Sequence, residues 1–235
     1  MKERSMGAIA ERFNQVKQRI QIACDHANRS ADEITLLAIS KTQPVEALLE
    51  VWQEGQSCFG ENYVQEWRSK YEALHTLESE GLTWHFTGRL QRNKCKYLAG
   101  KVGLIHTIDS LSLLKEVEKR TPEGHTQDVL IQLNLAQEES KSGFQTIEEL
   151  RSIFQPETPW KRIKLCGLMT IPPQGTEEET RAHFRQIKQA QQTLQSQYAI
   201  ELPELSMGMS GDLEIAIEEG ATIIRVGTAI FGQRK

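Results

Sequence analysis

A lysine stands at the point where a buried strand is expected to end. The stretch LLAISKTQP runs from Leu36 to Pro44, and its apolar residues stop just before Lys41. A lysine can simply reach solvent on its flexible stem. It can also present a reactive amine inside a pocket, because burial and a neighbouring cation both lower the pKa of an ammonium group.

A second cation, Arg225, interrupts the apolar run TIIRVGT near the C-terminus. A guanidinium keeps its proton in proteins, so it needs a hydrogen-bond acceptor wherever it is buried. Asp109, Glu61 and Glu214 are candidate ion-pair partners within the chain. A ligand atom is the alternative acceptor, and in a shared pocket Arg225 would also lower the pKa of Lys41.

Two glycine-containing segments have the features of an anion site. SMGMSGD begins at Ser206 and precedes an expected short helix, which Ser210 is placed to cap. RVGTAIFG leaves the last expected strand through Gly227 and Thr228. The free N–H groups and the positive dipole end at the start of a helix bind anions such as phosphate. The glycines could instead serve only tight turns.

Together these features suggest a phosphorylated aldehyde or ketone that Lys41 holds as a Schiff base. Pyridoxal phosphate satisfies all three requirements, namely a phosphate site, a buried arginine and a reactive amine. A sugar phosphate in an aldolase that uses no cofactor satisfies them equally well. The residue pattern alone does not separate these two ligands.

The elements that must position these residues follow an alternating pattern. Strand-like runs begin at Ile34, Ser57, Thr83, Gly103, Asp128, Lys164, Glu204 and Thr222, and helical patterns separate them. Eight strands alternating with helices over 235 residues predict an α/β fold, a single (β/α)8 TIM barrel. A doubly wound open sheet is the alternative. In a barrel, the chemistry gathers at the carboxyl ends of the strands.

The first strand is preceded by an amphipathic segment. Ile9, Phe13, Val16 and Ile20 recur at helical spacing, which predicts an extra N-terminal helix over about residues 6–28. The barrel itself is expected over about residues 34–232. No Pro/Gly/Ser-rich linker divides the chain, so we expect residues 1–235 to form one domain.

Composition and charge exclude several classes of function. The net charge of −4 gives no general attraction to nucleic acid, and no apolar run reaches the roughly 18 residues of a membrane span. The four cysteines are scattered without a C-x-x-C pair, which argues against a zinc site or a disulfide framework. The N-terminus has no continuous apolar core typical of a signal peptide, so we expect a cytoplasmic protein. The basic segment 89–101 is interpreted as a solvated helix face, with a partner-docking surface as the alternative.

A resemblance to a known family covers nearly the whole chain. The segments LLAISKTQP, FGENYVQE, WHFTGRLQRNK, HTID, VLIQLN, ESKSGF, GLMTIP, LSMGMSGDLEIAI and IRVGTAIFG occur in this order. They resemble the pyridoxal phosphate homeostasis protein family, whose barrel is similar to the N-terminal domain of alanine racemase and follows an extra helix.

The resemblance implies a set of cofactor-binding residues. Lys41 would carry pyridoxal 5′-phosphate as an internal aldimine, and Arg225 would face the pyridine nitrogen. The phosphate would rest on Ser206, Met207, Ser210, Gly227 and Thr228. Asn62 would lie near the ring, and His85 would be a neighbour behind it.

The resemblance also implies a function without appreciable catalysis. Similar racemases add a C-terminal β domain, and their dimer supplies a tyrosine base on the opposite face of the cofactor. Because this chain ends soon after its last expected strand, we expect it to lack that domain. Racemisation with two bases would then lack its second base, unless Tyr63 or His85 substitutes. We therefore expect a monomeric carrier in intracellular pyridoxal phosphate homeostasis, with apo-enzymes as candidate recipients. A low-activity amino-acid racemase is the alternative.

Overall fold

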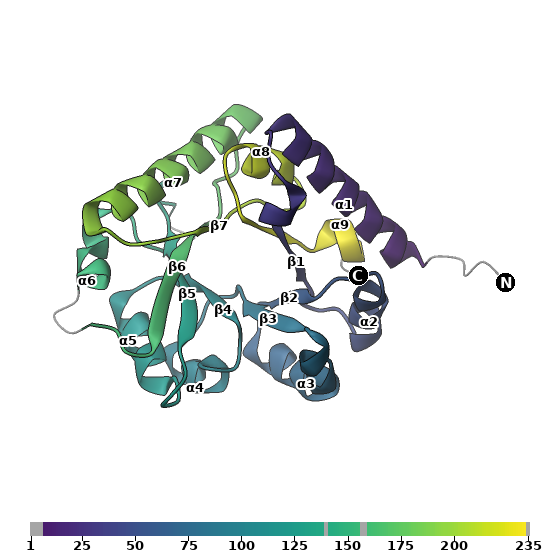
Figure 1. Cartoon of the computed structure of the whole chain (residues 1–235), viewed down its shortest axis with the longest axis horizontal. Helices are drawn as coiled ribbons and strands as arrows, with labels where there is room; N and C mark the ends of the chain where they lie inside the picture. The colour runs from purple at the N-terminus through teal and green to yellow at the C-terminus, as the bar shows by residue number, and fades with distance from the viewer. Residues whose placement is uncertain (1–6, 139–140, 156–158, 234–235) are drawn as a thin grey trace.

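The chain folds into a closed barrel of parallel strands surrounded by helices (Figure 1). The structure is a computed structural model, and it describes residues 7–138, 141–155 and 159–233. The strands are β1 Thr35–Ile39, β2 Cys58–Glu61, β3 Thr83–Phe86, β4 Leu104–Ile108, β5 Gln127–Leu133, β6 Ile163–Thr170, β7 Glu204–Ser206 and β8 Ile223–Val226. Each strand pairs with the next along the chain, and β8 pairs with β1, where Leu37 is opposite Arg225. The predicted barrel is therefore confirmed, and the open sheet is excluded by the pairing of β8 with β1.

Helices lie between consecutive strands, before β1 and after β8, and they cover the outside of the barrel. They are α1 Ala8–His26, α2 Val45–Gln53, α3 Val64–Leu74, α4 Cys95–Leu98, α5 Leu111–Arg120, α6 Arg151–Phe154, α7 Glu177–Tyr198, α8 Leu213–Glu218 and α9 Thr228–Phe231. Short 3₁₀ turns occupy Ala31–Glu33, His75–Glu80, Arg92–Lys94 and Glu148–Leu150. The helix starts follow local side-chain chemistry, because Ser110 accepts from the Leu113 N–H and Thr176 forms a capping box with Glu179.

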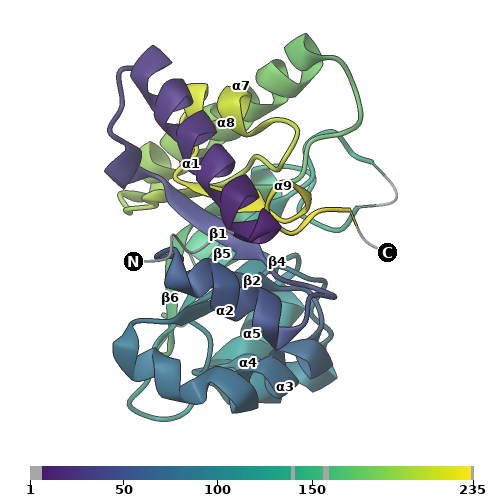
Figure 2. The same ribbon diagram turned by 90° about the vertical axis from the view of Figure 1, so that its right-hand side faces the viewer.

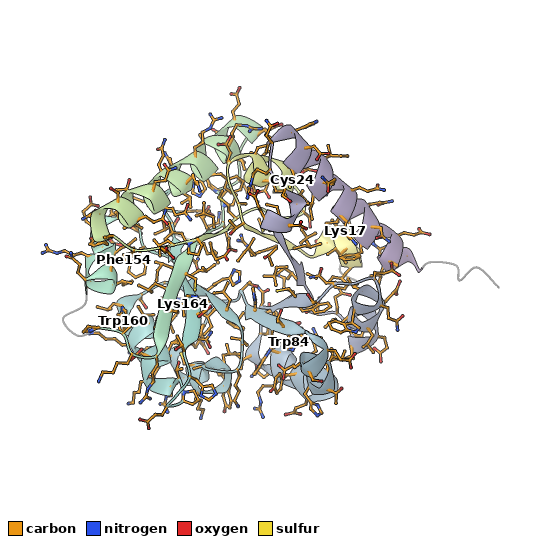
Figure 3. The ribbon with its side chains drawn as sticks, in the orientation of Figure 1. Lys17, Cys24, Trp84, Phe154, Trp160 and Lys164 are labelled. Carbon is orange, nitrogen blue, oxygen red and sulfur yellow. The ribbon has the colours of Figure 1, made fainter. Side chains whose placement is uncertain are left out.

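Two apolar layers hold the barrel together. The smaller cluster contains only strand residues and fills the barrel interior: Leu37, Ile39, Cys58, Leu104, Leu130, Cys166, Met169 and Ile223. The larger cluster packs the outer faces of the strands against the helices. Trp84 of β3 belongs to this outer layer (Figure 3), where it is buried. Its ring centroid lies 6.0 Å from that of Phe59. Side chains alternate along each strand, so neighbouring residues belong to different layers.

The predicted N-terminal helix is α1, and it lies beside α8 and α9 on the outside of the barrel (Figures 1 and 2). Residue 6, the first of the predicted range, lies outside the described residues. In the basic segment 89–101, a 3₁₀ turn and α4 replace one continuous helix. Across the ranges that the structure describes, none of the helices is both long and apolar enough to cross a membrane.

Candidate functional site

A cavity of about 260 Å³ opens at the carboxyl ends of the strands. Among the predicted site residues, Lys41, Asn62, Ser210, Arg225, Gly227 and Thr228 line it. They come from segments far apart in the sequence, and the closure of β8 against β1 brings the first and last of them together. The cavity-lining residues among those that the structure describes include two cations, Lys41 and Arg225, and no carboxylate. This charge balance suits an anionic ligand.

Lys41 follows β1 in the turn that leads to α2. Its side chain is half-buried, and it shares the cavity with Arg225 of β8. Pro44 is the N-cap of α2. The turn thus places an amine and a guanidinium around one space.

Asn62 lies at the cavity where the loop after β2 closely approaches the loop after β3. Its Oδ1 accepts a hydrogen bond from the Thr87 hydroxyl at 3.2 Å. Gly88, the residue after Thr87, lies so close to Asn62 that a Cβ on residue 88 would stand 1.9 Å from the Asn62 carbonyl oxygen. Only glycine permits this contact, which fixes the loops after β2 and β3 against each other. Thr87 also lines the cavity, although sequence reasoning did not select it.

Arg225 is buried with a side chain that donates in two directions. Nη1 donates to Ser206 Oγ at 2.8 Å, and Nη2 donates to the Thr170 carbonyl at 2.8 Å. Glu61 and Glu214, considered as partners from the sequence, pair instead with Lys70 and Arg19. Burial lowers the pKa of the Arg225 guanidinium to about 10, so it stays charged at neutral pH.

Ser206 and His85 lie behind Arg225 and do not line the cavity. Ser206 Oγ is 2.8 Å from His106 Nδ1, and His106 Nε2 is 3.0 Å from His85 Nδ1. His85 lines a separate cavity at the amino-terminal ends of the strands. The structure therefore places His85 two hydrogen-bonded residues away from Arg225. His106 belongs to this series of hydrogen bonds, and sequence reasoning missed it. The signal that could have been used is a histidine within the apolar strand β4.

Met207 and Ser210 are placed differently from their predicted roles. The Met207 side chain is fully buried in the outer apolar layer, and its N–H donates to the Ile223 carbonyl. We therefore do not retain Met207 as a ligand contact. Ser210 lines the cavity but does not cap α8, whose N-cap is Asp212. Instead, its Oγ accepts from the Ala229 N–H at 3.2 Å, which joins the loops after β7 and β8.

Comparisons with known proteins agree with this architecture. The family model described as "Alanine racemase, N-terminal domain" matches residues 10–235. The pyridoxal phosphate homeostasis protein of Aquifex aeolicus is 48% identical over 227 residues, which cover 96% of this chain and 98% of the relative. The protein of the same name from Escherichia coli K12 is 42% identical over 236 residues, covering 97% of this chain and 98% of the relative.

Solved structures show the same fold. PipY of Synechococcus elongatus, determined with pyridoxal phosphate (PLP) bound, superimposes with a TM-score of 0.83 at 35% identity, covering 95% of this chain and all (100%) of that one. Alanine racemase of Corynebacterium glutamicum has a TM-score of 0.65 at 14% identity, covering 94% of this chain and 62% of the racemase, and it shares the fold alone. The chain belongs to the pyridoxal phosphate homeostasis protein family, within the larger family of the alanine racemase N-terminal domain.

Proposed function

We propose that this chain binds pyridoxal 5′-phosphate in the cavity between Lys41 and Arg225 and acts in the homeostasis of that cofactor. The observation that carries the proposal is the pairing of an amine and a buried guanidinium across one cavity without a lining carboxylate, among the residues that the structure describes. The names of the relatives and the ligand of PipY support it.

The cavity residues fit the parts of this cofactor. The Lys41 amine would form a Schiff base with the aldehyde carbon, and the aldehyde oxygen would leave as water. The phosphate would be bound by Ser210, Gly227 and Thr228, which follow the carboxyl ends of β7 and β8. Arg225 would face the ring nitrogen, and Asn62 would lie near the ring.

Arg225 also limits the chemistry that this site can support. When bound, pyridoxal phosphate supplies an electron sink whose strength depends on the protonation of its ring nitrogen. A guanidinium that keeps its own proton only donates, so it leaves that nitrogen unprotonated. The resulting weaker sink favours reversible binding over stabilisation of a carbanion. We therefore propose a carrier without appreciable catalysis.

The lining of the cavity supports the same proposal. Lys41 and Arg225 are the titratable groups among the described residues that line it. Tyr63, considered as a second base, is 55% exposed and does not contribute to the lining, and His85 lies behind Arg225. Racemisation with two bases needs a second proton-transfer group within hydrogen-bond reach of the substrate. Among the described residues that line the cavity, Arg225 is the titratable group besides Lys41, and its guanidinium keeps its proton.

Reduction with borohydride tests the binding site. Wild-type protein mixed with pyridoxal phosphate should be yellow, lose that colour on reduction, and carry the label on Lys41. Lys41→Ala should lose the covalent label. At a hundredfold excess over Kd, the ligand should stabilise the wild-type fold by about 2.7 kcal/mol, and the variant should lose the part of this that depends on Lys41. Lys96→Ala, a change at an exposed lysine, should behave as wild type. Protein that stays colourless and takes up no cofactor would favour the aldolase instead.

Hydrogen exchange separates the carrier from the racemase. Loaded protein is incubated with L-alanine in deuterium oxide, and the α-proton is followed by NMR. We expect no sustained exchange above a sample without protein. Accumulation of deuterated D-alanine would establish the racemase alternative.

The proposal extends to a cytoplasmic monomer that passes the cofactor to apo-enzymes. The four cysteines are free and buried, which suits a reducing compartment. Light scattering should give the mass of one chain. Activation of a pyridoxal phosphate-dependent apo-enzyme by loaded protein, at a rate above that of spontaneous release, would demonstrate the transfer.

A further inference from the structure

The backbone just before Lys41 is held by buried polar contacts. The Ser40 N–H donates to the Gly60 carbonyl at 2.9 Å, and the Ser40 hydroxyl donates to Glu61 Oε1 at 2.7 Å. The Ser40 carbonyl accepts from Lys70 Nζ at 2.7 Å. Ser40 and Glu61 are fully buried, and Lys70 is nearly so. Each polar group of Ser40 is thus fastened to β2 or α3.

The backbone just after Lys41 is held from the same helix. The Thr42 N–H donates to Glu66 Oε2 at 2.6 Å, and Glu66 lies one turn before Lys70 on α3. Thr42 has a φ of 64°, a left-handed conformation that a β-branched residue rarely adopts. An unfavourable backbone conformation persists only where the surroundings impose it. Helix α3 therefore contacts both neighbours of Lys41, and a turn hydrogen bond from the Gln43 N–H to the Ser40 carbonyl at 3.0 Å closes the loop between them.

Stability alone does not account for the buried charges in this arrangement. Lys70 Nζ and Glu61 Oε1 are 2.6 Å apart between β2 and α3, and Glu61 Oε2 is buried without a hydrogen-bond partner. Burial raises the pKa of Glu61, although the Lys70 charge opposes this effect. An apolar pair of similar volume is often as stable as a buried ion pair or more so. What the charged pair adds here is a fixed anchor for the Ser40 carbonyl and hydroxyl.

We propose that Ser40, Glu61, Glu66 and Lys70, here called the turn clamp, position the Lys41 amine for reaction with the cofactor aldehyde. This inference rests on the proposed function. None of the four residues lines the cavity, so they act through the backbone and not by touching the ligand. Reacting atoms must approach to about 3–3.5 Å, and a displacement of about 1 Å can cost about a hundredfold in rate. A long, flexible side chain meets this requirement more often when its Cα is fixed on both sides.

The most direct test removes the contact to Thr42. Glu66 lies on the surface side of the clamp, so Glu66→Ala should fold. We expect this variant to link pyridoxal phosphate about tenfold more slowly, as followed by absorbance, because the turn is released. Its Kd for pyridoxine 5′-phosphate should change less than about twofold. That ligand keeps the ring and phosphate but has an alcohol in place of the aldehyde, so its binding needs no amine chemistry.

Glu72→Ala provides the matched control, because Glu72 is an exposed acidic residue on the same helix. It should leave both the linkage rate and the pyridoxine 5′-phosphate affinity unchanged. A parallel fall of both quantities in Glu66→Ala would show a general loss of the cavity and overturn the proposal. Unchanged linkage in Glu66→Ala would overturn it as well.

A second variant tests the buried pair without leaving an isolated charge. Glu61→Met combined with Lys70→Met replaces both groups by apolar side chains of similar length. We expect thermal stability close to wild type and a linkage rate that is about tenfold lower. A stable double variant that reacts at the wild-type rate would contradict the role of the pair. If borohydride reduction of loaded wild-type protein leaves no cofactor attached to Lys41, the proposed function is refuted, and this inference with it.

Discussion

Arg225 begins a series of hydrogen bonds behind the cavity. A guanidinium only donates, so the Ser206 oxygen accepts from Arg225 Nη1. Ser206 Oγ and His106 Nδ1 are 2.8 Å apart, and His106 Nε2 and His85 Nδ1 are 3.0 Å apart, with a donor that depends on the tautomer of each ring. Burial lowers the pKa of His85 to about 4 and that of His106 well below its usual value, which keeps both neutral at pH 7.

The serine in this chain should be costly to remove. Ser206→Ala takes the acceptor from Arg225 Nη1 and the hydrogen-bond partner from His106 Nδ1, both in a buried position. We expect the free energy of unfolding to fall by about 1–3 kcal/mol, the cost of leaving buried polar groups without partners. Urea denaturation measures this change. Ser69→Ala, at an exposed position of α3, should stay within about 0.5 kcal/mol of wild type, and equal losses in both variants would contradict the assignment.

At the scale of elements, α1 fastens the loops that complete the cavity. Arg19 forms a bidentate ion pair with Glu214 of α8, at 2.6 and 2.9 Å, and also donates to the Ser210 carbonyl at 3.0 Å. Arg12 Nε donates to the Ile230 carbonyl of α9 at 2.8 Å. A helix outside the barrel thus holds both loops proposed to receive the phosphate.

Arg19→Ala should therefore weaken ligand binding more than it weakens the fold. Arg19 and Glu214 are each more than a third exposed, so the pair itself should contribute about 1 kcal/mol or less to stability. Release of the Ser210 loop should raise the Kd for pyridoxine 5′-phosphate by about threefold to tenfold, which calorimetry can measure. Lys17→Ala, whose ammonium lies over the Phe13 ring of the same helix, serves as the control. An unchanged Kd in Arg19→Ala would show that α1 does not act on this loop.

At the scale of the whole molecule, the order of the strands could be predicted from the sequence. The side-chain contacts between the barrel interior and the outer helical layer could not. The barrel and its cavity at the carboxyl ends of the strands could be predicted because apolar runs alternate with helical patterns. The position of His85 depends on how far adjacent strands are staggered, and periodicity does not contain that information. The side of the sheet that Glu61 faces does follow from strand alternation. Gly60 faces Leu37 and Ile39 in the interior, so Glu61, the next residue, must face outward.

Helix α3 shows a signal that could have been used. Val64, Trp67, Lys70 and Leu74 are its buried residues, so Lys70 occupies an apolar position of the helical repeat. A lysine at such a position indicates a buried partner or a function. Its contacts with Glu61 and Ser40 could not be derived in the same way, because they depend on the packing of α3 over β2.

Two buried histidines and the partly buried His85 should make the stability of the whole molecule depend on pH. Burial lowers the folded-state pKa of His85, His106 and His183, whereas all three have a pKa of about 6.5 when the chain is unfolded. Below pH 6.5 the unfolded chain therefore binds more protons than the folded chain, and the free energy of unfolding falls as the pH falls. For His85 the loss extends from about pH 6.5 to about pH 4 and amounts to about 3 kcal/mol at most.

Urea denaturation of wild type and His85→Asn at pH 7.5, 6 and 5 measures this dependence. The variant should be less stable at pH 7.5, because its shorter side chain disturbs the contact with His106, but its stability should fall less between pH 7.5 and pH 5. Comparing the two slopes removes the contribution of carboxyl groups, which titrate in both proteins. His75→Gln, at an exposed position, should keep the wild-type slope. Equal slopes in wild type and His85→Asn would mean that His85 is protonated alike in the folded and unfolded chains, which would contradict the neutral chain of imidazoles behind Arg225.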